Sequence, residues 1–249
     1  MKARGVLFGL NYTGTDCALN GCINDVAAMR QFLEKECAIP CEVYTDDVSP
    51  DDTTYTGIVA RLYELAVATY RDSLDMVWIH YSGHGSFVVD TSGDEADGRD
   101  EGIVPTDYQR VGIIIDDVIN RILMSFNPRT RVVTVFDSCH SGTVCDMKYI
   151  WESPTKARLD NVACAIRAPM ISISGCLDVQ VSMDAYDPKR RAFQGALTTC
   201  LLATLEDKAI RANIFKVHDR LRAVLKERGF EQQSMLSSTY SLFKDPKFL

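Results

Sequence analysis

The chain has 249 residues with a formal net charge of −7, and 24% of its residues are charged. This length suits a single α/β domain with a substantial core, and Lys and Arg are mixed among acidic residues without a basic stripe, which argues against a nucleic-acid partner. Since no apolar stretch approaches the length of a membrane span and residues 1–10 lack a signal-peptide core, we expect a soluble, cytoplasmic protein.

Strand and helix patterns alternate along the chain, as in an α/β protein with a mainly parallel sheet. In chain order we expect a strand over 5–10, a helix over 24–36, a strand over 42–45, a helix from 53 or 54 to about 70, a strand over 76–81, a helix that begins at 116 and a strand over 132–136. After residue 142 we expect an irregular segment to about 166, then a strand over 170–174, helices near 193–206 and 214–228, and a last strand within 236–242.

Two short motifs follow the apolar strands at 76–81 and 132–136. They are Tyr81-Ser82-Gly83-His84-Gly85 and Asp137-Ser138-Cys139-His140-Ser141-Gly142. Because chemistry collects at the carboxyl ends of parallel strands, we expect His84 and Cys139 at neighbouring strand ends. A thiolate attacks a carbonyl carbon and a nearby imidazole takes the thiol proton, so Cys139 is the candidate nucleophile and His84 the candidate acid and base. Their separation of 55 residues is close to the roughly 50 residues of caspase-type pairs.

Each of these residues taken alone fits a structural role better, as a buried cysteine or a satisfied loop histidine. Their joint position at two strand ends favours catalysis. The nine cysteines are scattered and odd in number, which fits a reducing compartment better than a disulfide framework. Zinc is a less favoured alternative, because Cys17 with Cys22 and Cys37 with Cys41 lack compact CxxC spacing.

Further short motifs are spread along the chain. They are Gly21–Val26, His80–Gly85, Gly93–Glu101, Asp116-Asp117, Asp137–Gly142 and Ser174–Cys176. With these motifs the chain resembles the metacaspases, a family of caspase-like cysteine peptidases. The resemblance implies a caspase-like α/β fold whose mostly parallel central sheet is flanked by helices on both faces. It also implies one peptidase domain over 1–249, with a large-subunit-like part (1–150), a linker (151–165) and a small-subunit-like part (166–249).

An acidic substrate pocket is expected beside the Cys/His pair. Side chains alternate along a strand, so Asp137 points the same way as Cys139, and Ser82 the same way as His84. An acid in this place predicts a preference for Arg or Lys at P1, the substrate residue before the scissile bond. The resemblance implies that this pocket is lined by Cys22, Asp25, Ser82 and Asp137. For Asp25 alone, an acid that favours a helix N-terminus is the simpler interpretation.

An oxyanion site and a metal site complete the expected machinery. The backbone N–H groups of Gly85 and Cys139 are the candidate donors to the oxyanion at the scissile carbonyl. The resemblance implies calcium as a cofactor, with four aspartates as ligands: Asp100, Asp116, Asp117 and Asp146. Without the resemblance, Asp116-Asp117 would indicate only a helix start, and residues 94–100 a solvated acidic loop.

The sequence therefore predicts a calcium-stimulated cysteine endopeptidase that acts as a monomer and cleaves protein substrates after Arg or Lys. Self-processing is expected in the irregular segment, which offers Lys148, Lys156, Arg158 and Arg167. Two alternatives stay open. One is a Cys/His peptidase with a different P1 specificity, and the other is a noncatalytic proteostasis or interaction module on a peptidase fold.

Overall fold

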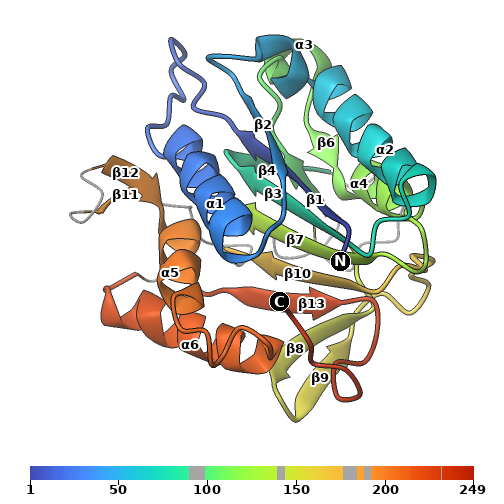
Figure 1. The fold of residues 1–249 in the computed structure, drawn as a ribbon. Coiled ribbons are helices and arrows are strands. Elements are labelled where there is room, and N and C mark those ends of the chain that lie inside the picture. Colours follow the sequence, from blue (N-terminus) through green and yellow to red (C-terminus); the bar gives the residue numbers. More distant parts are fainter. Residues whose placement is uncertain (90–98, 139–143, 176–183, 188–191, 231) are drawn as a thin grey trace.

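The computed structural model describes residues 1–89, 99–138, 144–175, 184–187, 192–230 and 232–249, with the backbone alone at 184–187 and 192–194. Its main sheet has eight strands in the order β2-β1-β3-β7-β10-β13-β8-β9 (Figure 1). Their bounds are Cys41–Thr45 (β2), Ala3–Gly9 (β1), Met76–Ser82 (β3), Arg131–Asp137 (β7), Met170–Ser174 (β10), Met235–Ser238 (β13), Tyr149–Ser153 (β8) and Lys156–Leu159 (β9). The five strands from β2 to β10 are parallel, and the last three add antiparallel pairings.

Helices cover both faces of this sheet (Figure 1). One core joins it to α1 (Cys22–Glu36), α5 (Ala196–Leu205) and α6 (Ile214–Glu227), and the other joins it to α2 (Tyr55–Arg71) and α4 (Asp116–Leu123). Alternate strand residues enter the two cores, as Trp78 and Val77 do in β3. Because both faces are covered, every residue of β3 and β10 is buried. The predicted fold class is confirmed.

Smaller elements lie beside the main sheet. A three-stranded sheet consists of β4 (Gly85–Val89), β5 (Arg99–Ile103) and β6 (Ile114–Ile115), and a two-stranded one of β11 (Asp184–Asp187) and β12 (Ala192–Gly195). Short helices occur at η1 (Pro50–Thr53) and α3 (Tyr108–Val111). Within the described ranges, no helix has the length and apolar character that crossing a membrane requires.

The prediction of an irregular segment from 142 to 166 is wrong for residues 149–159. Strands β8 and β9 form an antiparallel hairpin there, and β8 pairs with β13 at the end of the main sheet. Trp151 is buried and its indole Nε1 donates to Ser238 Oγ at 2.8 Å. Residues 151–153 and 156–159 of the expected linker (151–165) therefore belong to the sheet. Strands β8 and β9 are short, and β9 at the exposed edge carries charged residues. Their sequences therefore show no clear alternation of apolar and polar residues.

Candidate active site

Strands β3 and β7 bring the two predicted motifs to one edge of the sheet. They are parallel neighbours, and Ser82 pairs in register with Asp137. His84 follows β3 by two residues, and residue 139 stands at the same distance beyond β7. Cys139 itself lies outside the described residues, so its contact with His84 stays a prediction. The structure places His84 and the first two residues of the second motif, Asp137 and Ser138, at the carboxyl edge of the sheet, where they were expected.

A main-chain carbonyl orients the His84 ring. Its Nε2 lies 2.7 Å from the carbonyl oxygen of Cys17, in the segment between β1 and α1. A carbonyl oxygen only accepts hydrogen bonds, so Nε2 is the protonated nitrogen and donates to it. In the neutral ring, Nδ1 then holds the lone pair. His84 therefore presents the nitrogen that can take a proton on the side away from Cys17.

Two buried tyrosines hold the main chain at His84. The hydroxyl of Tyr12 accepts from His84 N–H at 3.0 Å and donates to the Val104 carbonyl oxygen at 2.7 Å. The hydroxyl of Tyr81 donates to the His84 carbonyl oxygen at 2.8 Å and lies 2.9 Å from that of Tyr12. Burial raises the pKa of Tyr12 well above 10, so this hydroxyl stays neutral. The pair fixes the turn on which the catalytic histidine is expected.

Gly83 is required between these tyrosines. A Cβ atom at this position would lie 2.6 Å from Tyr81 Oη and 2.9 Å from Tyr12 Oη, closer than such atoms approach. The Tyr12 ring also packs against His84, with ring centroids 4.8 Å apart. The sequence analysis missed Tyr12 and Tyr81, because Tyr12 stands in an irregular segment and Tyr81 has the pattern of an ordinary core residue.

His80 and His218 have other surroundings. Both side chains are buried, and burial lowers the pKa of His80 to about 3 and that of His218 to about 4. Thr198 Oγ1 lies 3.2 Å from His80 Nε2, and the Ser234 carbonyl oxygen lies 3.1 Å from His218 Nε2. These two histidines are neutral core residues at pH 7.

The four predicted pocket residues lie near one another and are all buried. Their exposed fractions are 3% for Cys22, 0% for Asp25, 1% for Ser82 and 3% for Asp137. Ser82 Oγ donates to Asp25 Oδ2 at 2.5 Å, which joins the end of β3 to α1. Cys22 is the first residue of α1. Its N–H donates to Asn11 Oδ1 at 3.0 Å, and this hydrogen bond fixes the start of the helix.

Asp25 and Asp137 converge on the start of helix α5. Gly195 N–H lies 2.9 and 3.0 Å from the two carboxylate oxygens of Asp25, and Thr198 N–H donates to Asp137 Oδ2 at 2.8 Å. A Cβ atom at Gly195 would lie 2.1 Å from Asp137 Oδ2 and 2.8 Å from Asp25 Oδ2. Only glycine fits between the two acids. The favourable N-terminus of α5 also stabilises their negative charge, which compensates part of the cost of burial.

The three segments that carry the predicted calcium ligands lie next to one another. Asp116 begins α4, and its Oδ2 accepts from the N–H of Glu101 in β5, next to Asp100, at 2.9 Å. Asn120 of α4 donates through Nδ2 to the Cys145 carbonyl oxygen at 3.2 Å, beside Asp146. Asp100 lies in β5 and is 6% exposed, so it is not in a solvated loop.

The donor chemistry of these aspartates suits Ca²⁺, which prefers carboxylate oxygens. Their side chains are not gathered into a complete site: in the part of the chain that the structure describes, no three His, Cys, Asp or Glu side chains form a group that could hold a metal ion. Asp117, whose N–H donates to Asp116 Oδ1 at 2.8 Å, stands beside the buried Asp116. The metal assignment of Asp100, Asp116, Asp117 and Asp146 stays a prediction.

The predicted oxyanion donors are described only in part. Gly85 begins β4 directly after His84 and is partly exposed, whereas Cys139 lies outside the described ranges. Val104, which directly follows β5, fixes this segment, because its N–H donates to the His84 carbonyl oxygen at 3.0 Å. Gly85 is therefore held beside the candidate base, and its role as a donor stays a prediction.

Comparison with known proteins identifies similar sequences. The family model "Metacaspase, peptidase C14 domain" matches residues 3–148, which include every predicted site residue. Metacaspase-1B of Aspergillus terreus is 35% identical over 167 residues, 65% of this chain and 44% of the relative. Metacaspase-1 of Ajellomyces capsulatus is 37% identical over 167 residues, 65% of this chain and 47% of the relative. The chain thus matches less than half the length of these two relatives.

Solved structures share the fold. A crystal structure of protein GSU0716 from Geobacter sulfurreducens superposes with a TM-score of 0.70 at 25% identity, covering 99% of this chain and 97% of that one. The Drosophila initiator caspase Dronc gives a TM-score of 0.56 at 12% identity over 94% of this chain and 78% of that one. The second likeness concerns the fold alone.

Proposed function

The chain belongs to the metacaspase family of C14 peptidases, and on that premise we propose that it is a cysteine endopeptidase that cleaves its substrates after Arg or Lys. The observation that carries the specificity is the convergence of Asp25 and Asp137 on Gly195, at the same sheet edge as His84. Two buried carboxylates attract a guanidinium or ammonium group and repel an acidic side chain.

The proposed chemistry begins with the free nitrogen of His84. Nδ1 takes the proton of the Cys139 thiol, and the thiolate attacks the scissile carbonyl carbon. The oxyanion accepts hydrogen bonds from the backbone N–H groups of Gly85 and Cys139, each worth about 2.7–4 kcal/mol in transition-state stabilisation by comparison with other enzymes. Protonated His84 then gives its proton to the leaving amine. Water, activated by the same nitrogen, hydrolyses the acyl-enzyme and frees Cys139.

The Cys17 carbonyl supports each of these steps. When Nδ1 is protonated, the imidazolium donates from Nε2 to this carbonyl at 2.7 Å, which fixes the ring while the proton moves at the other nitrogen. The tyrosine pair holds the main chain of His84 at the same time. Preorganisation of this kind avoids a conformational cost in the transition state.

We also propose that calcium stimulates the peptidase through Asp100, Asp116, Asp117 and Asp146. The support is the adjacency of β5, the start of α4 and the turn at Asp146, together with the burial of Asp100 and Asp116. Bound calcium would neutralise the mutual repulsion of these carboxylates and favour an ordered arrangement of the three segments. Its effect is limited by the difference in calcium affinity between the two arrangements.

The hairpin β8–β9 distinguishes the candidate positions for self-cleavage, because Lys156 and Arg158 lie in strand β9 and Arg167 does not. Lys156 forms an ion pair with Glu152, and Arg158 one with Asp160 at 3.0 Å, both on strand β9 or beside it. A peptidase binds its substrate as an extended, accessible chain, so a paired strand is a poor target. Arg167 is exposed and lies outside the strands, which makes it the favoured position. Intact-mass measurement after incubation identifies the cleaved bond.

We infer a monomer from the two edges of the main sheet. The edge strand β9 has only four residues and carries the ion-paired Lys156 and Arg158, while β2 at the other edge has five residues and carries Glu42, which pairs with Arg4 at 3.6 Å. Short edge strands with charged residues resist pairing with another chain.

The experiment that tests the function is turnover of fluorogenic peptides that differ only at P1. Arg and Lys peptides should be cleaved and the matching Asp peptide should not. Equal turnover of the Asp peptide would show that the acidic pocket does not select the substrate.

A further inference from the structure

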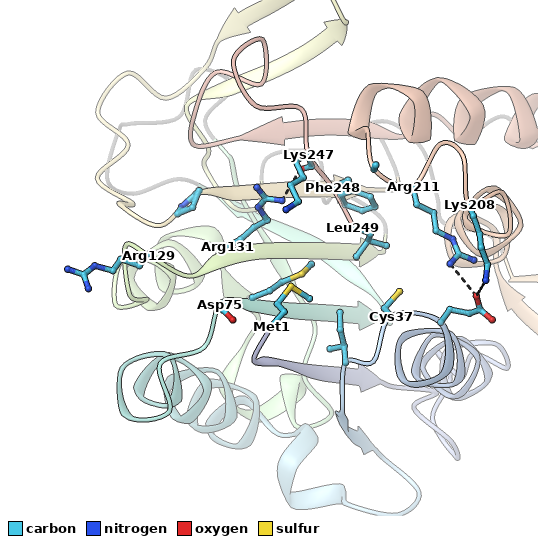
Figure 2. A pocket seen from close by; sticks show the side chains of 15 residues that line it. Met1, Cys37, Asp75, Arg129, Arg131, Lys208, Arg211, Lys247, Phe248 and Leu249 are labelled. Carbon is cyan, nitrogen blue, oxygen red and sulfur yellow. Dashed lines mark hydrogen bonds and ion pairs between the residues drawn. The ribbon is translucent and has the colours of Figure 1, made fainter.

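A cavity of about 770 Å³ lies at the amino ends of the central strands, on the sheet edge opposite His84 and Asp137 (Figure 2). It is lined by Met76 at the start of β3, Arg131 at the start of β7 and Pro169 just before β10. Pockets for small molecules commonly have volumes of roughly 300–1,000 Å³. The size of this cavity is thus that of a ligand site, and the proposed peptidase reaction does not use it.

Basic side chains stand on two sides of the cavity, as Figure 2 shows. On one side Arg131 Nη1 donates to the Lys247 carbonyl oxygen at 3.3 Å, and Nη2 pairs with Asp245 at 3.1 Å. Lys247 has no ion pair within the described ranges. Arg129 and Asp75 also line the cavity beside Arg131, so this wall carries three cations and two anions, a surplus of one positive charge.

The opposite wall has the same surplus. Lys208 and Arg211 share the carboxylate of Glu36, at 3.2 and 3.3 Å. These two cations lower the pKa of Glu36, which stays ionised. The Arg211 guanidinium is also fixed by stacking on Phe32, 4.8 Å from the ring centroid, so its position is set before a ligand arrives. In a chain with a net charge of −7, this cavity is a local positive region.

Between the two walls the cavity surface is apolar. Cys37, Pro169 and Ala212 are its exposed or partly exposed members, and the buried core residues Ile39, Met76 and Phe248 lie behind them. Such a surface binds the apolar or aromatic body of a ligand, while guanidinium and ammonium groups bind phosphate oxygens. The lining thus offers both an apolar surface and basic side chains, which together suit an organic anion with more than one acidic group.

From these observations we propose that the cavity is a binding site for a small organic polyphosphate, with its phosphates against the basic walls and its organic body against Cys37, Pro169 and Ala212. The site is separate from the catalytic edge. Its occupancy does not depend on whether the chain is a peptidase, so a failure of one proposal leaves the other testable.

The test is calorimetric titration of the Cys139→Ala chain with ATP, inorganic triphosphate and adenosine, without divalent metal. Because Met1 and Leu249 also line the cavity, any affinity tag is removed first. We expect saturable 1:1 binding of ATP, at least tenfold tighter than that of either triphosphate or adenosine. The double variant Lys208→Glu/Lys247→Glu should weaken ATP binding at least tenfold.

The matched control is Lys216→Glu/Lys226→Glu, which makes the same change in net charge on exposed positions of α6. It should leave the ATP affinity unchanged, and thermal unfolding should show that both double variants fold. The proposal is overturned if ATP does not bind saturably at millimolar concentration, if triphosphate binds as tightly as ATP, or if both double variants weaken binding equally.

Discussion

His84 and Cys17 are joined by a hydrogen bond of 2.7 Å between the imidazole Nε2 and a main-chain carbonyl oxygen. This contact assigns the proton to Nε2 and leaves Nδ1 to accept one, which is the state a general base needs at the start of the proposed reaction. It comes from the main chain, so no side-chain substitution at Cys17 removes it directly. Tests of the histidine must therefore use the residues that hold its backbone.

Tyr12→Phe should impair catalysis while the Cys139 motif is unchanged. The substitution leaves His84 N–H without its hydroxyl acceptor, at a cost of about 1–3 kcal/mol, and removes one of the two tyrosine hydroxyls within hydrogen-bond distance of the Val104 carbonyl oxygen. We expect a lower kcat for an Arg peptide with little change in KM, and a lower free energy of unfolding. Tyr70→Phe is the control, since Tyr70 is exposed and its hydroxyl donates to the Phe126 carbonyl oxygen at the long distance of 3.4 Å. Equal effects of the two variants would contradict the role of Tyr12.

Asp25→Asn should weaken recognition of a basic P1 residue. The amide keeps an acceptor for Gly195 N–H but removes one of the two converging negative charges. Loss of a buried charge partner costs about 2 kcal/mol or more, so kcat/KM for an Arg peptide should fall roughly 30-fold. Asp219→Asn, on the exposed face of α6, should have no such effect. An unchanged preference for Arg over Asp peptides in Asp25→Asn would show that Asp25 lies outside the substrate pocket.

Acid should destabilise the fold through its buried histidines. The pKa of His80 is about 3 and that of His218 about 4 in the folded chain, below the ordinary value of 6.5. The unfolded chain therefore binds more protons below pH 6.5, so the free energy of unfolding falls as the pH drops from about 6.5 toward 4. The slope is about 1.4 kcal/mol per pH unit for each histidine well below that point.

Denaturant unfolding at pH 7, 6 and 5 measures this slope, and His218→Gln should reduce it. A slope that His218→Gln does not change would mean that His218 is accessible to protons in the folded chain.

Calcium should bind the Cys139→Ala chain, which cannot process itself, and Asp117→Asn should weaken that binding. Asp117 is the least buried of the acids at the start of α4, so its loss should reduce affinity without disrupting the bonds of Asp116 to Glu101. Calorimetry compares this variant with Asp47→Asn, an exposed acid on another turn. If no saturable binding occurs at millimolar calcium, the four aspartates are a structural cluster and the chain is not regulated by this metal.

The sequence was most informative where local pattern and topology coincide. The apolar runs before His84 and Asp137 are the parallel neighbours β3 and β7, and Ser82 lies opposite Asp137 where the two strands end. The sequence could not locate Gly195, because that contact joins positions 170 residues apart along the chain. The hairpin over 149–159 was missed because its short strands are stabilised by pairing with β13, a tertiary interaction that local propensity does not encode.

The most direct test of the central claim is turnover of an Arg fluorogenic peptide by the native chain and by Cys139→Ala, with calcium present and with the matching Asp peptide as comparison. The account predicts cleavage of the Arg peptide by the native chain, no cleavage of the Asp peptide, and no cleavage of either by a Cys139→Ala chain with native thermal stability. Turnover of the Arg peptide that survives Cys139→Ala, or a folded native chain that cleaves no basic peptide, would contradict it.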